Sequence, residues 1–179
     1  MTIQMPRTKT ICEGLSLTLV VLAAAGCGYR LRGTGSFLPP SVKTMSIPVF
    51  KNLTTRYELD IKLTRAVIDE MVARGKVVIA ADPEKADATL EGEVVSFSAN
   101  PVAFTGQARA DRYTITVKAK IVLKERAADR TIFSNPSFVY VEEYEVPSGR
   151  DFESVQTEAI DRVAEKFARS LVATILEGF

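Results

Sequence analysis

Few side chains in this 179-residue sequence could carry covalent chemistry. The sequence contains no histidine and only two cysteines, Cys12 and Cys27. A zinc site, a Ser-His-Asp triad and a Cys-His pair therefore all lack the residues that they require. No glycine-rich phosphate-binding motif opens a helix either. The groups left to consider are the two thiols and the carboxylates.

Closely spaced carboxylates occur, among them Glu91/Glu93 and Glu142/Glu143. Two carboxylates that flank a substrate can act as general acid and general base. Glu91 and Glu93, however, alternate with apolar or small residues, as expected for the solvated face of a strand. The sequence therefore predicts no enzyme, no metal site and no cofactor.

Cys27 lies where an apolar run ends. Arg7 and Lys9 precede the segment 15–25 (LSLTLVVLAAA), which is too short to span a bilayer but suits a signal peptide. Small residues and Cys27 follow this segment. The order resembles the lipobox of bacterial lipoproteins, in which signal peptidase II cuts before the cysteine and the new N-terminus carries acyl chains. An ordinary secretory signal or a buried N-terminal helix is the alternative.

The lipobox resemblance implies a lipoprotein signal peptide over residues 1–26 and a lipidated tether over residues 27–41, with the lipid on Cys27. Ala24 departs from the pattern, because Leu is usual at the third position before the cysteine. Several acyl chains anchor firmly, since each buried CH₂ contributes roughly 0.8 kcal/mol. Gly28, where enterobacterial proteins retained in the inner membrane carry Asp, favours the outer membrane.

The charge balance excludes one large class of partner. The formal net charge of the chain is +1. Removal of the leader takes away Arg7, Lys9 and Glu13 and leaves equal numbers of basic and acidic residues. Nucleic-acid binding needs a clear basic excess, so we expect no nucleic-acid partner.

The rest of the chain, residues 42–179, reads as a single domain with strands and two amphipathic helices. A capping box at Thr55–Glu58 predicts the start of a helix that ends before Gly75. A longer helix is predicted over residues 151–176. Alternating patterns predict strands over residues 42–50, 76–80, 88–98, 111–126 and 138–146. Residues 100–110 between two of them are expected to form a hairpin loop with Phe104 and Arg109 exposed.

Both predicted helices carry a wide apolar stripe that needs a surface to cover. The fold class predicted is therefore α+β, with two helices packed on one face of a four- to five-stranded mixed β-sheet. In the strand over residues 111–126, apolar residues occupy one face. The other face carries a basic stripe that consists of Arg112, Lys118, Lys120, Lys124 and Arg126.

Two interpretations of this basic stripe remain. Its ammonium and guanidinium groups suit the phosphates of a glycolipid, because charge-assisted hydrogen bonds are strong. Alternatively, the stripe is a solvated face whose lysines pair with glutamates on neighbouring strands. We favour the second, since lysine also protects open sheets from edge pairing.

Three stretches, "GCGYRLRG", "VKTMSIPVFKNLTTRYELDIKLTRAVIDEMVARG" and "ADATLEGEV", together resemble the lipopolysaccharide-assembly lipoproteins of the LptE family. The resemblance implies a non-enzymatic lipoprotein, attached to the cell outer membrane by its N-terminal lipid on the periplasmic side. Such a protein plugs the lumen of the β-barrel translocon LptD and assists lipopolysaccharide transport. Of the family's functional residues, Cys27 alone carries over; the basic stripe is a candidate ligand site from strand geometry.

A second resemblance leads to a different class of function. The segments "SIPVFKN", "LTRAVIDEMVARGKVVI" and "ADATLEGEV" also resemble the strand–helix–strand unit of lipoproteins that activate peptidoglycan synthases or form curli-secretion pores. Such a protein would regulate an enzyme or assemble into a ring. The long C-terminal helix and the GYRLRG start favour the first resemblance.

Overall fold

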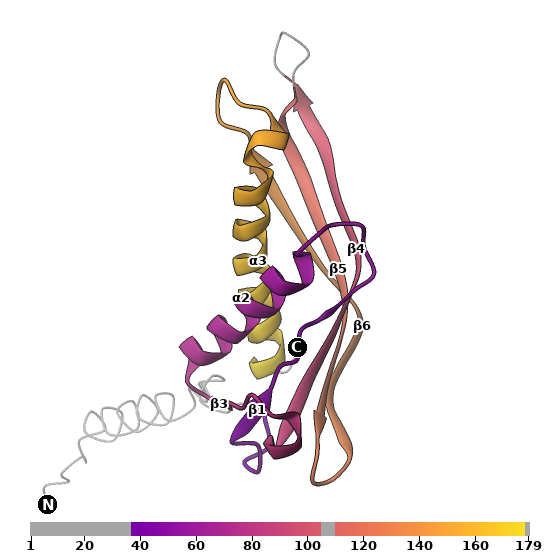
Figure 1. Cartoon of the computed structure of the whole chain (residues 1–179), viewed down its shortest axis with the longest axis vertical. Coiled ribbons are helices and arrows are strands. Elements are labelled where there is room, and N and C mark those ends of the chain that lie inside the picture. The colour runs from indigo at the N-terminus through magenta and orange to yellow at the C-terminus, as the bar shows by residue number, and fades with distance from the viewer. Residues whose placement is uncertain (1–36, 105–109, 178–179) are drawn as a thin grey trace, which may run out of the picture. The chain divides into compact units, whose positions relative to one another are not determined.

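The computed structural model describes residues 37–104 and 110–177. Cys27, the leader and Arg109 lie outside the described residues. The elements follow one another as β1 (Thr44–Ser46), β2 (Lys51–Asn52), α2 (Leu59–Arg74), β3 (Val78–Ile79), the 3-10 helix η1 (Pro83–Lys85), β4 (Ala88–Phe104), β5 (Ala110–Glu125), β6 (Arg130–Glu145) and α3 (Phe152–Glu177) (Figure 1). Three long strands and two helices therefore make up most of the domain.

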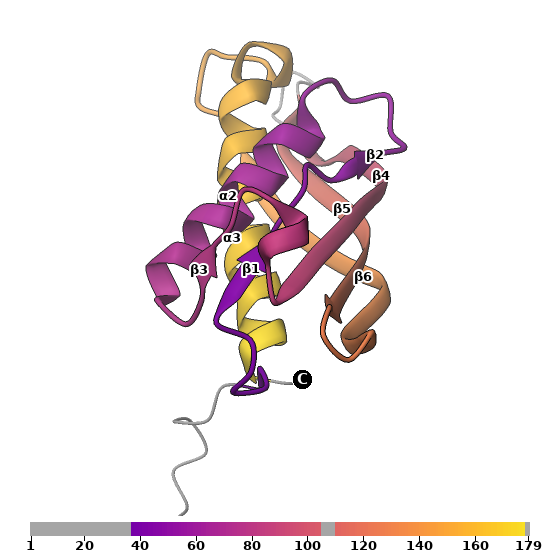
Figure 2. The same cartoon turned by 60° about the horizontal axis from the view of Figure 1, so that its bottom comes forward.

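The strands form one mixed sheet in the order β3-β1-β4-β5-β6, and β2 pairs separately with β4. β1 is parallel to β3 and β4, β2 is parallel to β4, and the long strands β4, β5 and β6 are antiparallel. Helices α2 and α3 lie on one face of the sheet (Figure 2). The predicted α+β fold is confirmed, with a sixth strand because Lys51 and Asn52 pair with β4.

The core lies between this face of the sheet and the helices. The apolar face predicted for the strand over residues 111–126, now β5, is buried, with Ile115, Val117, Ala119, Ile121 and Leu123 at most 1% exposed. The predicted stripe of the last helix is buried against them, from Val155 through Phe167 to Ile175. Within residues 37–104 and 110–177, neither helix has the length and hydropathy needed to cross a bilayer.

The capping box predicted for α2 is wrong. The helix begins at Leu59, and its preceding residue Glu58 has φ 57° with no capping hydrogen bond from a side chain. The side chain of Asn52 orders the approach instead: its Oδ1 accepts from the Thr54 amide at 2.9 Å, and its Nδ2 donates to the Arg56 carbonyl at 2.8 Å. The predicted stop at Gly75 is confirmed by its φ of 61°.

The hairpin loop predicted over residues 100–110 is also wrong in extent. β4 continues to Phe104, with Pro101 opposite Tyr113, and β5 resumes at Ala110. Beyond Val94, no described strand pairs with the other edge of β4, so Pro101 removes no ladder hydrogen bond there. Phe104 is 61% exposed, as predicted.

The first described residues attach the chain to the domain. The Phe37 amide donates to the Leu176 carbonyl at 2.9 Å, at the C-terminal end of α3. Leu38 and Val42 are buried, and Ser41 Oγ donates to the carboxylate of Glu125 at 2.6 Å. The described chain therefore begins at the end of the domain that holds the last turn of α3.

Candidate functional site

Helices α2 and α3 leave the opposite face of the sheet uncovered (Figures 1 and 2). Strict alternation along β5 gives this outer face its character, because every second residue of a strand points away from the core. Lys118, Lys120 and Lys124 are exposed on it, while their neighbours Val117, Ala119 and Leu123 are buried. The outer face is therefore polar and basic along its central strand.

Lys118 and Lys120 lie at the centre of the basic stripe, and neither is among the ion-paired residues that the structure describes. In register, Lys118 lies between Ser96 of β4 and Val139 of β6. Lys120 lies opposite Glu93, whose Oε2 is instead 3.8 Å from the Nζ of Lys51. Among the described residues, neither lysine forms an ion pair, so both ammonium groups are available to an external anion.

The other three basic residues of the stripe have different surroundings. Lys124 Nζ lies 2.9 Å from Glu91 Oε2, which is the cross-strand pairing that the solvated-face interpretation predicted. Arg112 is exposed and lies opposite Glu145 in register. Arg126 follows the end of β5, and its Nε donates to the Ala86 carbonyl at 2.9 Å. Among the described residues, Lys124 is therefore ion-paired and Arg126 is hydrogen-bonded, whereas Arg112, Lys118 and Lys120 form no ion pair.

Apolar side chains accompany the unpaired lysines. Val139 and Val141 of β6 are 46% and 54% exposed. They lie opposite Lys118 and Thr116. A surface that combines ammonium groups with exposed methyl groups can contact both a phosphate and an acyl or apolar group. Alternation within "FVYVEEY" puts Val139 and Val141 on the other face of the strand from Phe138 and Tyr140. The position of the two valines on the outer face could therefore have been predicted from the sequence.

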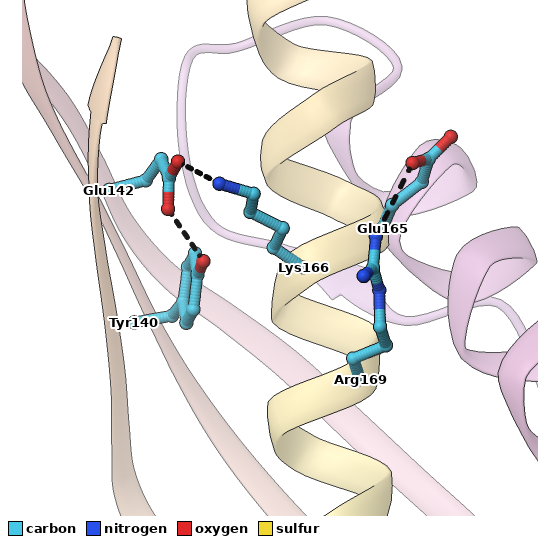
Figure 3. A network of polar contacts seen from close by, with 5 residues as sticks. All are labelled: Tyr140, Glu142, Glu165, Lys166 and Arg169. Carbon is cyan, nitrogen blue, oxygen red and sulfur yellow. Dashed lines mark hydrogen bonds and ion pairs between the residues drawn. The ribbon is translucent and has the colours of Figure 1, made fainter.

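A second polar cluster lies on the helix side of the sheet, between β6 and α3 (Figure 3). Glu142 points toward α3, and its Oε1 forms an ion pair with Lys166. Its Oε2 accepts a hydrogen bond from Tyr140 Oη at 2.9 Å. On the solvent side of α3, Arg169 lies 3.8 Å from Glu165. Both oxygens of Glu142 are thus occupied.

The surroundings of this cluster fix its protonation. Burial raises the pKa of Glu142, but the hydrogen bonds from Lys166 and Tyr140 and the charges of Lys166 and Arg162 outweigh burial, so its pKa lies below the usual value. Burial, and then the hydrogen bond to Glu142, raise the pKa of Tyr140 to about 12. Glu142 is therefore an ionised structural group and not a poised general base, and Glu143, its sequence neighbour, is exposed on the opposite face.

Comparison with known proteins gives one match that covers most of the chain. The model of a family described as "LptE: Lipopolysaccharide-assembly" matches residues 42–175. No curated protein sequence matches the chain.

Solved structures align with the chain at low sequence identity. The hypothetical protein CT253 from Chlamydia trachomatis aligns with a TM-score of 0.53 at 8% identity, covering 77% of this chain and 97% of that protein. The rare lipoprotein B from Shewanella oneidensis aligns with a TM-score of 0.42 at 13% identity, covering 74% and 96%. Lipoprotein GNA1162 from Neisseria meningitidis aligns with a TM-score of 0.40 at 10% identity, covering 71% and 99%. The likeness to CT253 shows a shared fold.

Proposed function

Because this chain belongs to the LptE lipopolysaccharide-assembly family, we propose that it is an outer-membrane lipoprotein that binds and plugs the β-barrel LptD. In this role it assists the assembly of lipopolysaccharide and its transport to the outer leaflet. The family is one of non-catalytic assembly lipoproteins. The match over residues 42–175 is the observation that carries the proposal, since it spans the whole described sheet, all of α2, and α3 except its last two residues.

The lipid attachment rests on the sequence around Cys27. Cleavage before this residue would leave its thiol and amine at the new N-terminus, where acyl chains hold the protein to a membrane. The lumen of a large outer-membrane barrel is polar. The uncovered outer face of the sheet, with its lysines, threonines and glutamates, has the composition that such a lumen accommodates.

Lipopolysaccharide carries phosphate groups and acyl chains, and the centre of the outer face offers a partner for each. We assign Lys118 and Lys120 as the residues that contact phosphate, because they form no ion pair with a described residue and lie near the exposed Val139 and Val141. Arg112, Lys124 and Arg126 are secondary candidates on the same stripe. Val139 and Val141 supply the neighbouring apolar contacts.

Purification from native outer membranes in mild detergent tests the proposal. We expect the acylated protein to bring with it a large β-barrel that mass spectrometry identifies as LptD. A Cys27→Ala chain serves as the control, because it should be absent from the membrane fraction. Recovery of a peptidoglycan synthase, or of a ring of this chain alone, would contradict the proposal and favour the second resemblance.

A further inference from the structure

The end of the domain where the described chain begins carries a shallow groove with one sign of charge. The groove has a volume of about 450 Å³ and lies between residues 38–43 and residues 75–78. Two lysines, Lys43 and Lys76, line it, and no acidic residue does. Both lysines are exposed, and neither forms an ion pair with a described residue. The groove is thus a small cationic surface.

Exposed apolar side chains flank these lysines. Val78 lies on the edge strand β3 and is 68% exposed, although its amide donates to the Lys43 carbonyl at 2.9 Å. Phe37 is 50% exposed and is fixed to the end of α3 through its own amide. Cationic groups beside exposed apolar residues are the combination found at the interface of proteins that lie on a lipid surface. We name Phe37, Lys43, Lys76 and Val78 the tether-end surface.

The length of chain before Phe37 limits how far this surface can lie from a membrane. Phe37 is the tenth residue after Cys27. Even fully extended, ten residues span only about 35 Å. The opposite end of α3 is farther away by the length of a 26-residue helix, which is about 39 Å. An anchor at Cys27 therefore limits the tether-end surface to about 35 Å from the lipid, whereas the Pro147–Arg150 loop can lie farther away by the length of α3.

We propose that, while the domain is not seated in a barrel, the tether-end surface docks on the phospholipid leaflet that holds the acyl chains. Lys43 and Lys76 contact the headgroup phosphates, while Phe37 and Val78 enter the interfacial region. The inference rests on acylation of Cys27, which belongs to the proposed function. Docking fixes the orientation of the domain: the tether-end surface faces the membrane, and the first turn of α3 points away from it.

Site-specific fluorescence on the acylated full-length mature protein tests this. A Val78→Cys variant receives an environment-sensitive fluorophore, and the protein is inserted into vesicles of phosphatidylethanolamine and phosphatidylglycerol that carry a nitroxide on the lipid headgroup. Acylation blocks the thiol of Cys27 and cleavage removes Cys12, so the new thiol is labelled uniquely. We expect the nitroxide to quench the label at residue 78. A Ser148→Cys label, in the exposed loop beyond the far end of α3, should stay unquenched.

Charge variants separate docking from mere tethering. Each basic residue beside an anionic surface contributes on the order of fivefold, so Lys43→Gln with Lys76→Gln should lower the ratio of docked to undocked protein roughly 25-fold. Neutral phosphatidylcholine vesicles and high salt should also lower the ratio of docked to undocked protein. The control is Lys51→Gln with Arg150→Gln, which removes the same charge elsewhere and should leave quenching unchanged.

Two failures are distinguishable in this experiment. Protein that carries no lipid by mass spectrometry and does not associate with vesicles contradicts acylation, and with it the proposed function. Acylated, vesicle-bound protein whose labels at residues 78 and 148 are quenched equally overturns the docking proposal alone. Label–label contact at residue 78 in place of quenching would show that this edge pairs with a second copy, which also overturns it.

Discussion

The ring of Phe50 occupies the space that a side chain at Gly92 would take. A Cβ built on Gly92 would lie 2.5–2.7 Å from three ring carbons of Phe50, closer than real atoms approach. The ring is 2% exposed, and the Phe50 amide donates to Thr64 Oγ1 of α2 at 2.9 Å. Phe50 therefore connects the segment before β2 with both β4 and α2, and it cannot move aside freely.

Gly92→Ala should destabilise the domain by about 2 kcal/mol, because overpacking a buried contact forces ring and backbone to shift. Urea denaturation followed by circular dichroism measures the change. Ser98→Ala, an exposed change on the same strand, is the control and should alter the free energy of unfolding by less than about 0.5 kcal/mol. Adding Phe50→Leu to Gly92→Ala should recover part of the loss; no recovery would mean that the ring is not the cause.

Stability should fall in acid through Glu125. Hydrogen bonds from Ser41, first, and Arg130 hold the pKa of Glu125 below its ordinary value of 4.5. The folded state thus binds fewer protons than the unfolded state, so the contribution is present above pH 4.5 and is lost as the pH falls through the folded-state pKa. Melting temperatures across this range measure it.

Glu125→Gln should flatten the acid limb of that curve without removing it. Asp87 retains a lowered pKa through hydrogen bonds from the Thr44 amide, the Thr44 hydroxyl and the Lys43 amide. An acid limb as steep as in the unchanged protein would contradict the role of Glu125.

The Tyr140–Glu142 pair should be visible in a spectrophotometric titration. Glu142→Gln removes the negative charge beside the phenol, so the pKa of Tyr140 should fall from about 12 while burial still keeps it above 10. Tyr140→Phe, which removes one hydrogen bond to a charged acceptor, should cost about 1.5–3 kcal/mol of stability. An unchanged tyrosine titration in Glu142→Gln would show that the two groups are not coupled.

Lipopolysaccharide binding should depend unequally on the basic stripe. Lys118→Gln with Lys120→Gln should weaken binding by roughly tenfold or more, since charge-assisted contacts contribute about 1.5–3 kcal/mol each when formed. Lys124→Gln should have a smaller effect, because Glu91 already neutralises Lys124. Binding to immobilised lipopolysaccharide measures this, with circular dichroism as the check on folding. If the unchanged protein, the double variant and the Lys124 variant bind equally, the basic stripe is a solvated face that does not bind lipopolysaccharide.

Cys27→Ala should yield a chain that carries no lipid, because alanine has no thiol to accept a diacylglyceryl group. Intact-mass spectrometry of the native protein should show acyl chains on a mature N-terminus at residue 27. Membrane fractionation should then place the variant outside the outer membrane. A native protein with a bare Cys27 and an untrimmed leader would contradict the lipoprotein assignment.

The elements with long, regular patterns were predictable from the sequence. Alternation over β5 and the apolar stripe of α3 each continue over many residues, so a single irregular position does not disguise them. One error occurred where another side chain, and not the expected local motif, makes the hydrogen bonds that order the backbone. The Thr55–Glu58 motif fits a capping box, yet Asn52 already holds the preceding turn through its side chain.

Two prolines explain why the predicted strands over residues 88–98 and 138–146 were too short. Pro101 and Pro136 suggest loop, but both lie on strand edges without a described partner on one side, where the missing N–H costs little. β4 and β6 are therefore longer than the strands predicted over residues 88–98 and 138–146. The Glu142–Lys166 contact was beyond reach for a different reason: alternation places Glu142 on the helix side, but only the packing of α3 decides which cation meets it.

The hydrogen bond from Phe37 to Leu176 brings the first and last described segments of the fold together. A reporter domain genetically fused after α3 would consequently lie beside Phe37 and crowd the tether-end surface. An epitope that should lie at the other end of the domain can be inserted in the exposed turn around Ser148, just before α3. An insertion there would leave both chain ends undisturbed.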